Sequence, residues 1–129
     1  MALKITLKPN ERMIIGGAVI TNGNKGSSFI IENNVPVLRQ SDIMSEKAAN
    51  TPSRRIYLAI QLMYVDNENL ATYYANYWNL VQDLVKAAPS MVIFVDQISE
   101  HIQGNRHYQA LKLTKKMIEY EQEVLNRVQ

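Results

Sequence analysis

The first fifty residues carry short apolar runs separated by turns. Leu3, Ile5 and Leu7 alternate with polar residues, which is the period of a half-buried strand. Further apolar runs occupy residues 13–15, 18–20, 29–32 and 35–39. Pro36 lacks a backbone N–H, so it favours an edge position for the last strand. We therefore predict about five short antiparallel strands in a small barrel-like or sandwich-like sheet.

After residue 50 the apolar positions follow the period of a helix. Thr51 followed by Pro52 is a typical helix start, and residues 51–65 have almost no polar side after Arg55. We therefore place this helix at the centre of the fold. Three more helices are predicted at about 66–88, 90–103 and 106–128. The last of them is expected to bury Leu111, Ile118, Leu125 and Val128.

The predicted fold class is α+β, with the small N-terminal sheet packed on a C-terminal bundle of about four helices. Residues 1–50 form the β-rich, basic part, and residues 51–129 form the helical part. The change at residue 50 is a change of layer, so we expect one compact structural unit.

Composition sets limits on the class of protein. The chain has 129 residues, of which 47% are hydrophobic and 20% are charged, as in an ordinary globular domain. The chain has no cysteine, so disulfides, thiol catalysis and cysteine-based metal sites are excluded. The first twelve residues are too charged for a signal peptide, and the longest apolar stretch, 56–65, is about half of a membrane span. We expect a cytoplasmic protein with no membrane partner.

Positive charge concentrates in the N-terminal part. Residues 1–55 hold eight basic and four acidic residues, a net charge of +4, whereas the remainder has a net charge of −2. Lys4 and Lys8 share one face of the first strand, because even spacing keeps side chains on one side. The candidate phosphate-binding residues are Lys4, Lys8, Arg12, Lys25, Arg39, Arg54 and Arg55. The alternative is a solvated face whose arginines pair with Glu11, Asp42 or Glu46.

Two of these candidates stand at an unfavourable place. Arg54 and Arg55 lie in the first turn of the helix that starts at Thr51, where the helix dipole favours acidic residues. Each arginine costs a few tenths of a kcal/mol there unless an anion lies nearby. That anion is either a structural carboxylate, with Asp42 and Glu46 the nearest in sequence, or a bound phosphate.

No enzyme signature is present, and we expect no catalytic residue, no cofactor and no metal. His101 and His107 flank a predicted turn with Asp96 and Glu100 nearby, but a solvated helix end explains them better than a metal site.

Aromatic residues gather at 73–78. They offer stacking platforms for single-stranded bases, but their place in an amphipathic helix favours a core or a protein interface. The candidate interface residues are Tyr73, Tyr77 and Trp78.

The whole chain resembles the FlbT family, the flagellin post-transcriptional regulators of alphaproteobacterial flagellar systems. Residues 2–23, 29–44, 49–64 and 107–125 carry the resemblance, and its most specific piece is Asn-Thr-Pro-x-Arg-Arg-Ile-Tyr at 50–57. The resemblance implies association with the 5′ untranslated region of flagellin mRNA, which lowers its translation and lifetime, although some members activate instead. It also implies a functional partnership with FlaF.

Two hypotheses about function follow. In the first, the chain is an RNA-binding repressor of flagellin translation whose basic residues hold the phosphates of the mRNA leader. Its helical half then provides homodimerisation or FlaF docking. In the second, the chain is a protein-interaction module that acts indirectly through FlaF, flagellin or a translation factor.

Overall fold

The structure is a computed structural model, and it describes residues 2–128. The chain divides between Ile43 and Met44 into two compact units, a β unit and a helical unit. The predicted α+β class is confirmed, and so are its five short strands and four helices. The boundary at residue 50, the single structural unit and the packing of the sheet on the helices stay predictions.

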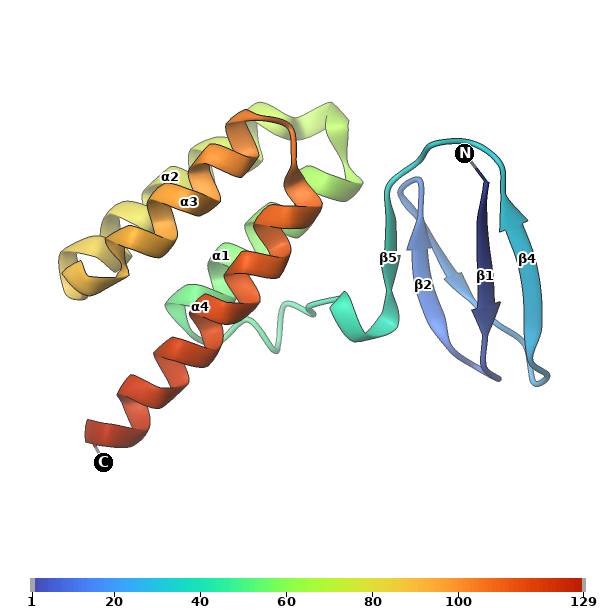
Figure 1. Cartoon of the computed structure of the whole chain (residues 1–129), viewed down its shortest axis with the longest axis horizontal. Coiled ribbons are helices and arrows are strands. Elements are labelled where there is room, and N and C mark those ends of the chain that lie inside the picture. Colours follow the sequence, from blue (N-terminus) through green and yellow to red (C-terminus); the bar gives the residue numbers. More distant parts are fainter. Residues whose placement is uncertain (1, 129) are drawn as a thin grey trace. The chain divides into compact units, whose positions relative to one another are not determined.

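The β unit contains two small antiparallel sheets (Figure 1). Strand β1 (Leu3–Leu7) pairs with β4 (Ser27–Ile31), with Ile5 opposite Phe29. Strand β2 (Arg12–Ile15) lies between β3 (Ala18–Thr21) and β5 (Val37–Arg39). The edge position predicted for the last strand is confirmed, and Pro36 itself lies just before that strand.

A shared core joins the two sheets. Ile5 and Leu7 of β1 and Met13 of β2 are buried, and side chains from both sheets pack against them. These packing residues are Ile15, Phe29, Ile31 and Val37. Each fully buried side chain of this kind stabilises the fold by about 1.5–3 kcal/mol. Of the two predicted forms, the β unit is therefore the sandwich-like one.

A diglycine turn sets the register between β2 and β3. Gly16 and Gly17 have φ angles of 56° and 87°, the left-handed conformation that a tight hairpin requires at both central positions. The Gly16 N–H also donates to the Pro36 carbonyl at 2.9 Å, which ties this turn to the start of β5.

The helical unit is built around its first helix. α1 (Pro52–Val65) contacts α2 (Leu70–Ala87) and α4 (His107–Val128), and α4 also contacts α3 (Val92–Gln103). Half of the α1 residues are buried, so its predicted central place is confirmed within this unit. Among the described residues, no helix is both long and apolar enough to cross a membrane.

The last helix differs from the prediction at its C-terminal end. Leu111 is buried as predicted and Ile118 is half-buried, but Leu125 is 44% exposed, so its predicted burial is wrong. α4 has 22 residues against 14 in α1, and it reaches the start of α1 already at Glu121. Leu125 lies one turn further on. The side chain of Val128 lies outside the described residues.

Candidate functional site

Four of the predicted basic residues meet at one end of the β unit. At this end β1, β3 and β5 finish and β2 and β4 begin; it is the lower end of the β unit in Figure 1. We call it the basic end, and it holds Lys8, Arg12, Lys25 and Arg39.

The Asn22 side chain links the backbone at Lys8 to the backbone at Lys25. The Asn22 side-chain amide donates to the Lys8 carbonyl at 2.8 Å and to the Lys25 carbonyl at 2.9 Å. Its oxygen accepts a hydrogen bond from the Ser27 hydroxyl at 2.9 Å. This role of Asn22 is not visible in the sequence, because the Asn22-Gly23 pair indicates a turn but not what the Asn22 side chain contacts.

The two arginines of the basic end stand at the ends of two paired strands. Their side chains start from opposite faces of the sheet, because Arg39 shares a face with Met13. Arg39 stands opposite Met13 in the β2–β5 register, next to Arg12. The Arg12 N–H also donates to the Gln40 side-chain oxygen at 2.6 Å, which fixes the start of β2 against the end of β5. The guanidinium groups therefore come from neighbouring strands.

The cations at the basic end form no ion pair with a described residue. All four side chains are exposed, and within residues 2–128 none of them forms an ion pair. Glu11 is one carboxylate near this end, and it accepts a hydrogen bond from the Lys8 backbone N–H at 2.8 Å; Asp42 follows Arg39 by three residues. The alternative of internal pairing with Glu11 is therefore not realised, and the end carries an excess of positive charge.

Lys4 belongs to the opposite end of the β unit. Its register partner is Ile30, near the end of β4, whereas Lys8 follows the end of β1. Four residues of extended chain separate the two lysines by about 13 Å. Lys4 is exposed like the others but stands apart from them.

Arg54 and Arg55 lie at the start of α1, in the helical unit. Arg54 is half-buried and donates from Nη1 to the Asn50 side-chain oxygen at 2.9 Å. Arg55 is exposed and lines a hollow of about 220 Å³ together with Glu46 and Leu58. Neither arginine forms an ion pair with a described residue.

The anion at the start of α1 is Glu121, a carboxylate from the far end of the chain. Its Oε2 accepts the Ser53 backbone N–H at 3.0 Å, and Thr51 Oγ1 accepts the Arg54 N–H at 3.2 Å. Glu121 is only 8% exposed. This carboxylate is neither Asp42 nor Glu46, the two expected from the sequence; Glu121 lies 68 residues beyond Ser53. The start of α1 thus already has a structural anion.

A protein-family model matches almost the whole chain. The model described as "Flagellar protein FlbT" matches residues 3–125. The chain belongs to the FlbT family. No solved structure matches it with significant similarity.

Relatives cover the chain almost completely. It is 43% identical to the "Probable flagellum biosynthesis repressor protein FlbT 1" of Bradyrhizobium diazoefficiens, over 96% of this chain and 85% of the relative. It is 39% identical to a protein of Rhodopseudomonas palustris named "Probable flagellum biosynthesis repressor protein FlbT", over 98% and 100%. The "Flagellum biosynthesis repressor protein FlbT" of Caulobacter vibrioides is 35% identical over 99% and 92%.

The aromatic candidates of this FlbT-family chain have different environments. Tyr77 is fully buried, and its hydroxyl lies 2.7 Å from that of Ser99 on α3. Burial raises the pKa of Tyr77 to about 12. Its predicted place at a protein interface is therefore corrected to a place in the core. Tyr73 and Trp78 are half-buried, and the Tyr73 hydroxyl donates to Asp66 at 2.6 Å.

The two histidines have separate structural roles. His101 Nδ1 accepts a hydrogen bond from Arg106 Nε at 3.1 Å, whereas His107 is buried and desolvation lowers its pKa. No group of three metal-ligating side chains gathers within the described part of the chain.

Proposed function

We propose that this chain is an RNA-binding post-transcriptional regulator of flagellin synthesis. In this proposal it associates in the cytoplasm with the 5′ untranslated region of flagellin mRNA, represses translation and destabilises the transcript. The names of its relatives, flagellum biosynthesis repressors, support the regulatory part of the proposal. The basic end of the β unit supports the RNA-binding part.

The observation that carries the RNA contact is the group of four exposed, unpaired cations on a braced end of two sheets. Arginine forks suit the oxygens of phosphate groups, and lysines act as point charges beside them. Such contacts hold the RNA backbone in place and carry little sequence information by themselves. A leader held over its ribosome-binding region is shielded from translation.

The helical unit has a different part in the proposal. Glu121 already provides a carboxylate at the start of α1. Arg54 and Arg55 are therefore weaker candidates for binding a phosphate than the four cations of the basic end. The helical unit instead contacts FlaF or a second copy of the chain. Tyr73 and Trp78 are the aromatic candidates for that contact, since both keep part of their surface exposed.

A salt titration tests the RNA contact. The full chain is titrated onto fluorescein-labelled flagellin leader RNA at several salt concentrations, and the affinity is measured by fluorescence anisotropy. For single strands, log K falls with log salt with a slope of about 0.7 per phosphate contact. Lys8→Gln/Lys25→Gln should therefore reduce the slope by about 1.4.

Lys4→Gln is the matched control, because Lys4 is equally exposed in the same unit but lies at its opposite end. It should leave the slope of the wild type unchanged. Equal effects of the control and of the double variant would show general electrostatic attraction instead of a site. If the leader does not bind at low salt, the RNA contact is refuted and an indirect action through a protein partner takes its place.

A further inference from the structure

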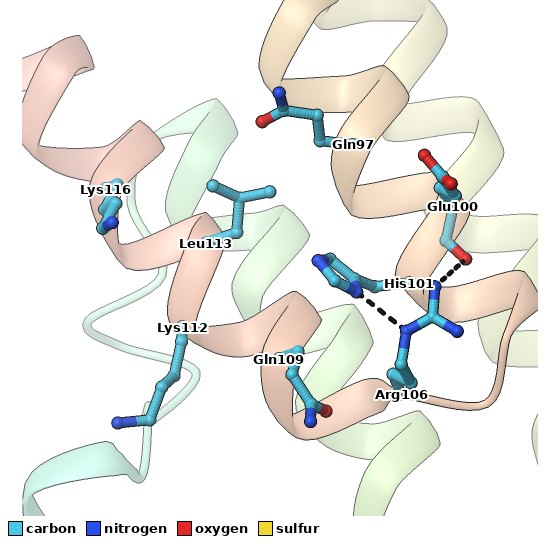
Figure 2. Close-up of a pocket in the computed structure, with 8 residues that line it drawn as sticks. All are labelled: Gln97, Glu100, His101, Arg106, Gln109, Lys112, Leu113 and Lys116. Carbon is cyan, nitrogen blue, oxygen red and sulfur yellow. Dashed lines mark hydrogen bonds between the residues drawn. The ribbon is translucent and has the colours of Figure 1, made fainter.

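A groove of about 470 Å³ lies between α3 and α4, outside the basic end (Figure 2). Gln97 comes from α3, Arg106 from the turn before α4, and Gln109, Leu113 and Lys116 from α4. Its volume is within the range of small-ligand sites. The proposed function assigns no role to it.

Arg106 is held in a fixed position at one end of the groove. Its Nε donates to His101 Nδ1 at 3.1 Å and its Nη2 to the Glu100 carbonyl at 3.4 Å, as Figure 2 shows. The guanidinium lies directly over Gly104, where an added Cβ would collide with it. A guanidinium has five N–H donors, so three remain for a ligand. An ordered arginine loses less conformational entropy on binding than a free one.

The lining of the groove is cationic. Lys112 and Lys116 stand one turn apart on α4, and Glu100 is the one carboxylate among the described residues that line the groove. The Lys112 ammonium lies 5.2 Å from the centre of the Tyr108 ring, whereas Lys116 has no partner among the described residues. The charge of this lining favours an anionic ligand.

Two unused amides give the groove hydrogen-bonding capacity. Gln97 and Gln109 reach it from opposite helices, and neither side chain has a hydrogen-bond partner among residues 2–128. A glutamine amide offers a donor and an acceptor side by side, which matches the edge of an unpaired base. Leu113 is the apolar residue of the lining, on which the flat face of a base can rest.

We propose that this groove binds one nucleotide of single-stranded RNA. Its phosphate lies on Arg106 and its base lies over Leu113 between the amides of Gln97 and Gln109. Lys116, about 15 Å further along α4, contacts the phosphate of a neighbouring nucleotide. A peptide helix would need several apolar anchors, and the groove offers one. The inference rests on the proposed function, because it gives the same leader RNA a second contact.

The test uses the full chain and the labelled leader RNA. Lys116→Gln should lower the salt slope by about 0.7, as the loss of one phosphate contact requires. Gln97→Leu/Gln109→Leu should weaken binding about tenfold at an unchanged slope, because it removes hydrogen bonds and no charge. Arg106→Lys keeps the charge but loses the fork, so it should also weaken binding. Lys86→Gln, an exposed lysine on α2, is the matched control and should change nothing.

The outcomes separate this inference from the proposed function. If Lys8→Gln/Lys25→Gln reduces the slope while all groove variants bind like the wild type, the groove site is refuted and the proposed function stands. If the wild type does not bind the leader, both are refuted. If a polyglutamate peptide binds with sensitivity to Lys116→Gln while RNA binding is insensitive, the groove serves an acidic protein instead.

Discussion

Glu121 allows a quantitative test of how the helical unit is held together. Its carboxylate is 8% exposed and accepts the Ser53 N–H at 3.0 Å, in the first turn of α1. Glu121→Ala removes this acceptor and leaves Ser53, which is fully buried, with an unsatisfied backbone donor. That loss costs about 1–3 kcal/mol, and the lost attraction between charge and helix dipole adds up to about 2 kcal/mol. We expect a total destabilisation of about 1–5 kcal/mol.

Glu121→Gln separates the hydrogen bond from the charge. The glutamine keeps an oxygen that accepts the Ser53 N–H, but it loses the negative charge beside the helix start. We expect a destabilisation of about 1 kcal/mol, which lowers the melting temperature of a unit of this size by about 5 °C. Glu119→Gln is the matched control, since Glu119 is exposed on the same helix and should change stability by less than about 0.5 kcal/mol.

The single tryptophan makes the assay specific to the helical unit. Trp78 lies on α2, with its ring centre 5.9 Å from that of Tyr74 and 5.6 Å from that of Tyr77. Its fluorescence in a urea titration therefore reports the unfolding of this unit. The reasoning is refuted if both Glu121 variants unfold at the same urea concentration as Glu119→Gln.

Three further predictions concern single side chains. Tyr77→Phe should cost about 1 kcal/mol by urea titration. It should also remove the loss of stability expected between pH 10 and 12, where Tyr77 in the unfolded chain ionises before the buried one. Asn22→Ala should expose the amides of residues 22–27 to faster hydrogen exchange and weaken binding of the leader RNA; unchanged exchange would contradict the bracing role. Burial lowers the pKa of His107 below 6.5, so the unfolded chain takes up this proton first. The stability of the helical unit should therefore fall as the pH drops below about 6.5, and His107→Gln should make this dependence weaker in urea titrations at pH 7 and pH 5.

Local sequence patterns were sufficient for the elements of the fold. Thr51 and Pro52 mark the start of α1 because capping and proline geometry depend on neighbouring residues only. The diglycine at residues 16 and 17 likewise specifies a hairpin, because both positions require a positive φ angle. The alternation in β1 predicted the buried Ile5 and Leu7. These features all act over a few residues.

Local sequence patterns do not predict contacts between segments that are far apart in the chain. Nothing near Ser53 in the sequence indicates that its N–H donates to Glu121, because this pairing depends on how α1 and α4 pack. The exposure of Leu125 has the same origin, since it depends on where α1 begins beside α4. Strand periodicity places Lys4 and Lys8 on one face of β1. It does not show that the two side chains lie at opposite ends of the β unit.

One feature of the sequence points to the groove between α3 and α4. Arg106 directly precedes the first turn of α4, so it also lies near the positive end of a helix dipole, as Arg54 and Arg55 do in the first turn of α1. A basic residue at a helix start indicates a nearby partner whichever helix it belongs to. For Arg106 these partners include His101, whereas for α1 the anion is Glu121.

Cross-linking can map directly where the leader RNA lies on the protein. Flagellin leader RNA carrying 4-thiouridine is cross-linked to the full chain by light, and the modified peptides are identified by mass spectrometry. We expect cross-links in residues 8–12 and 22–27, which belong to the basic end, and their loss in Lys8→Gln/Lys25→Gln but not in Lys4→Gln. Cross-links confined to the helical unit, or equal in all three proteins, would contradict an RNA site at the basic end.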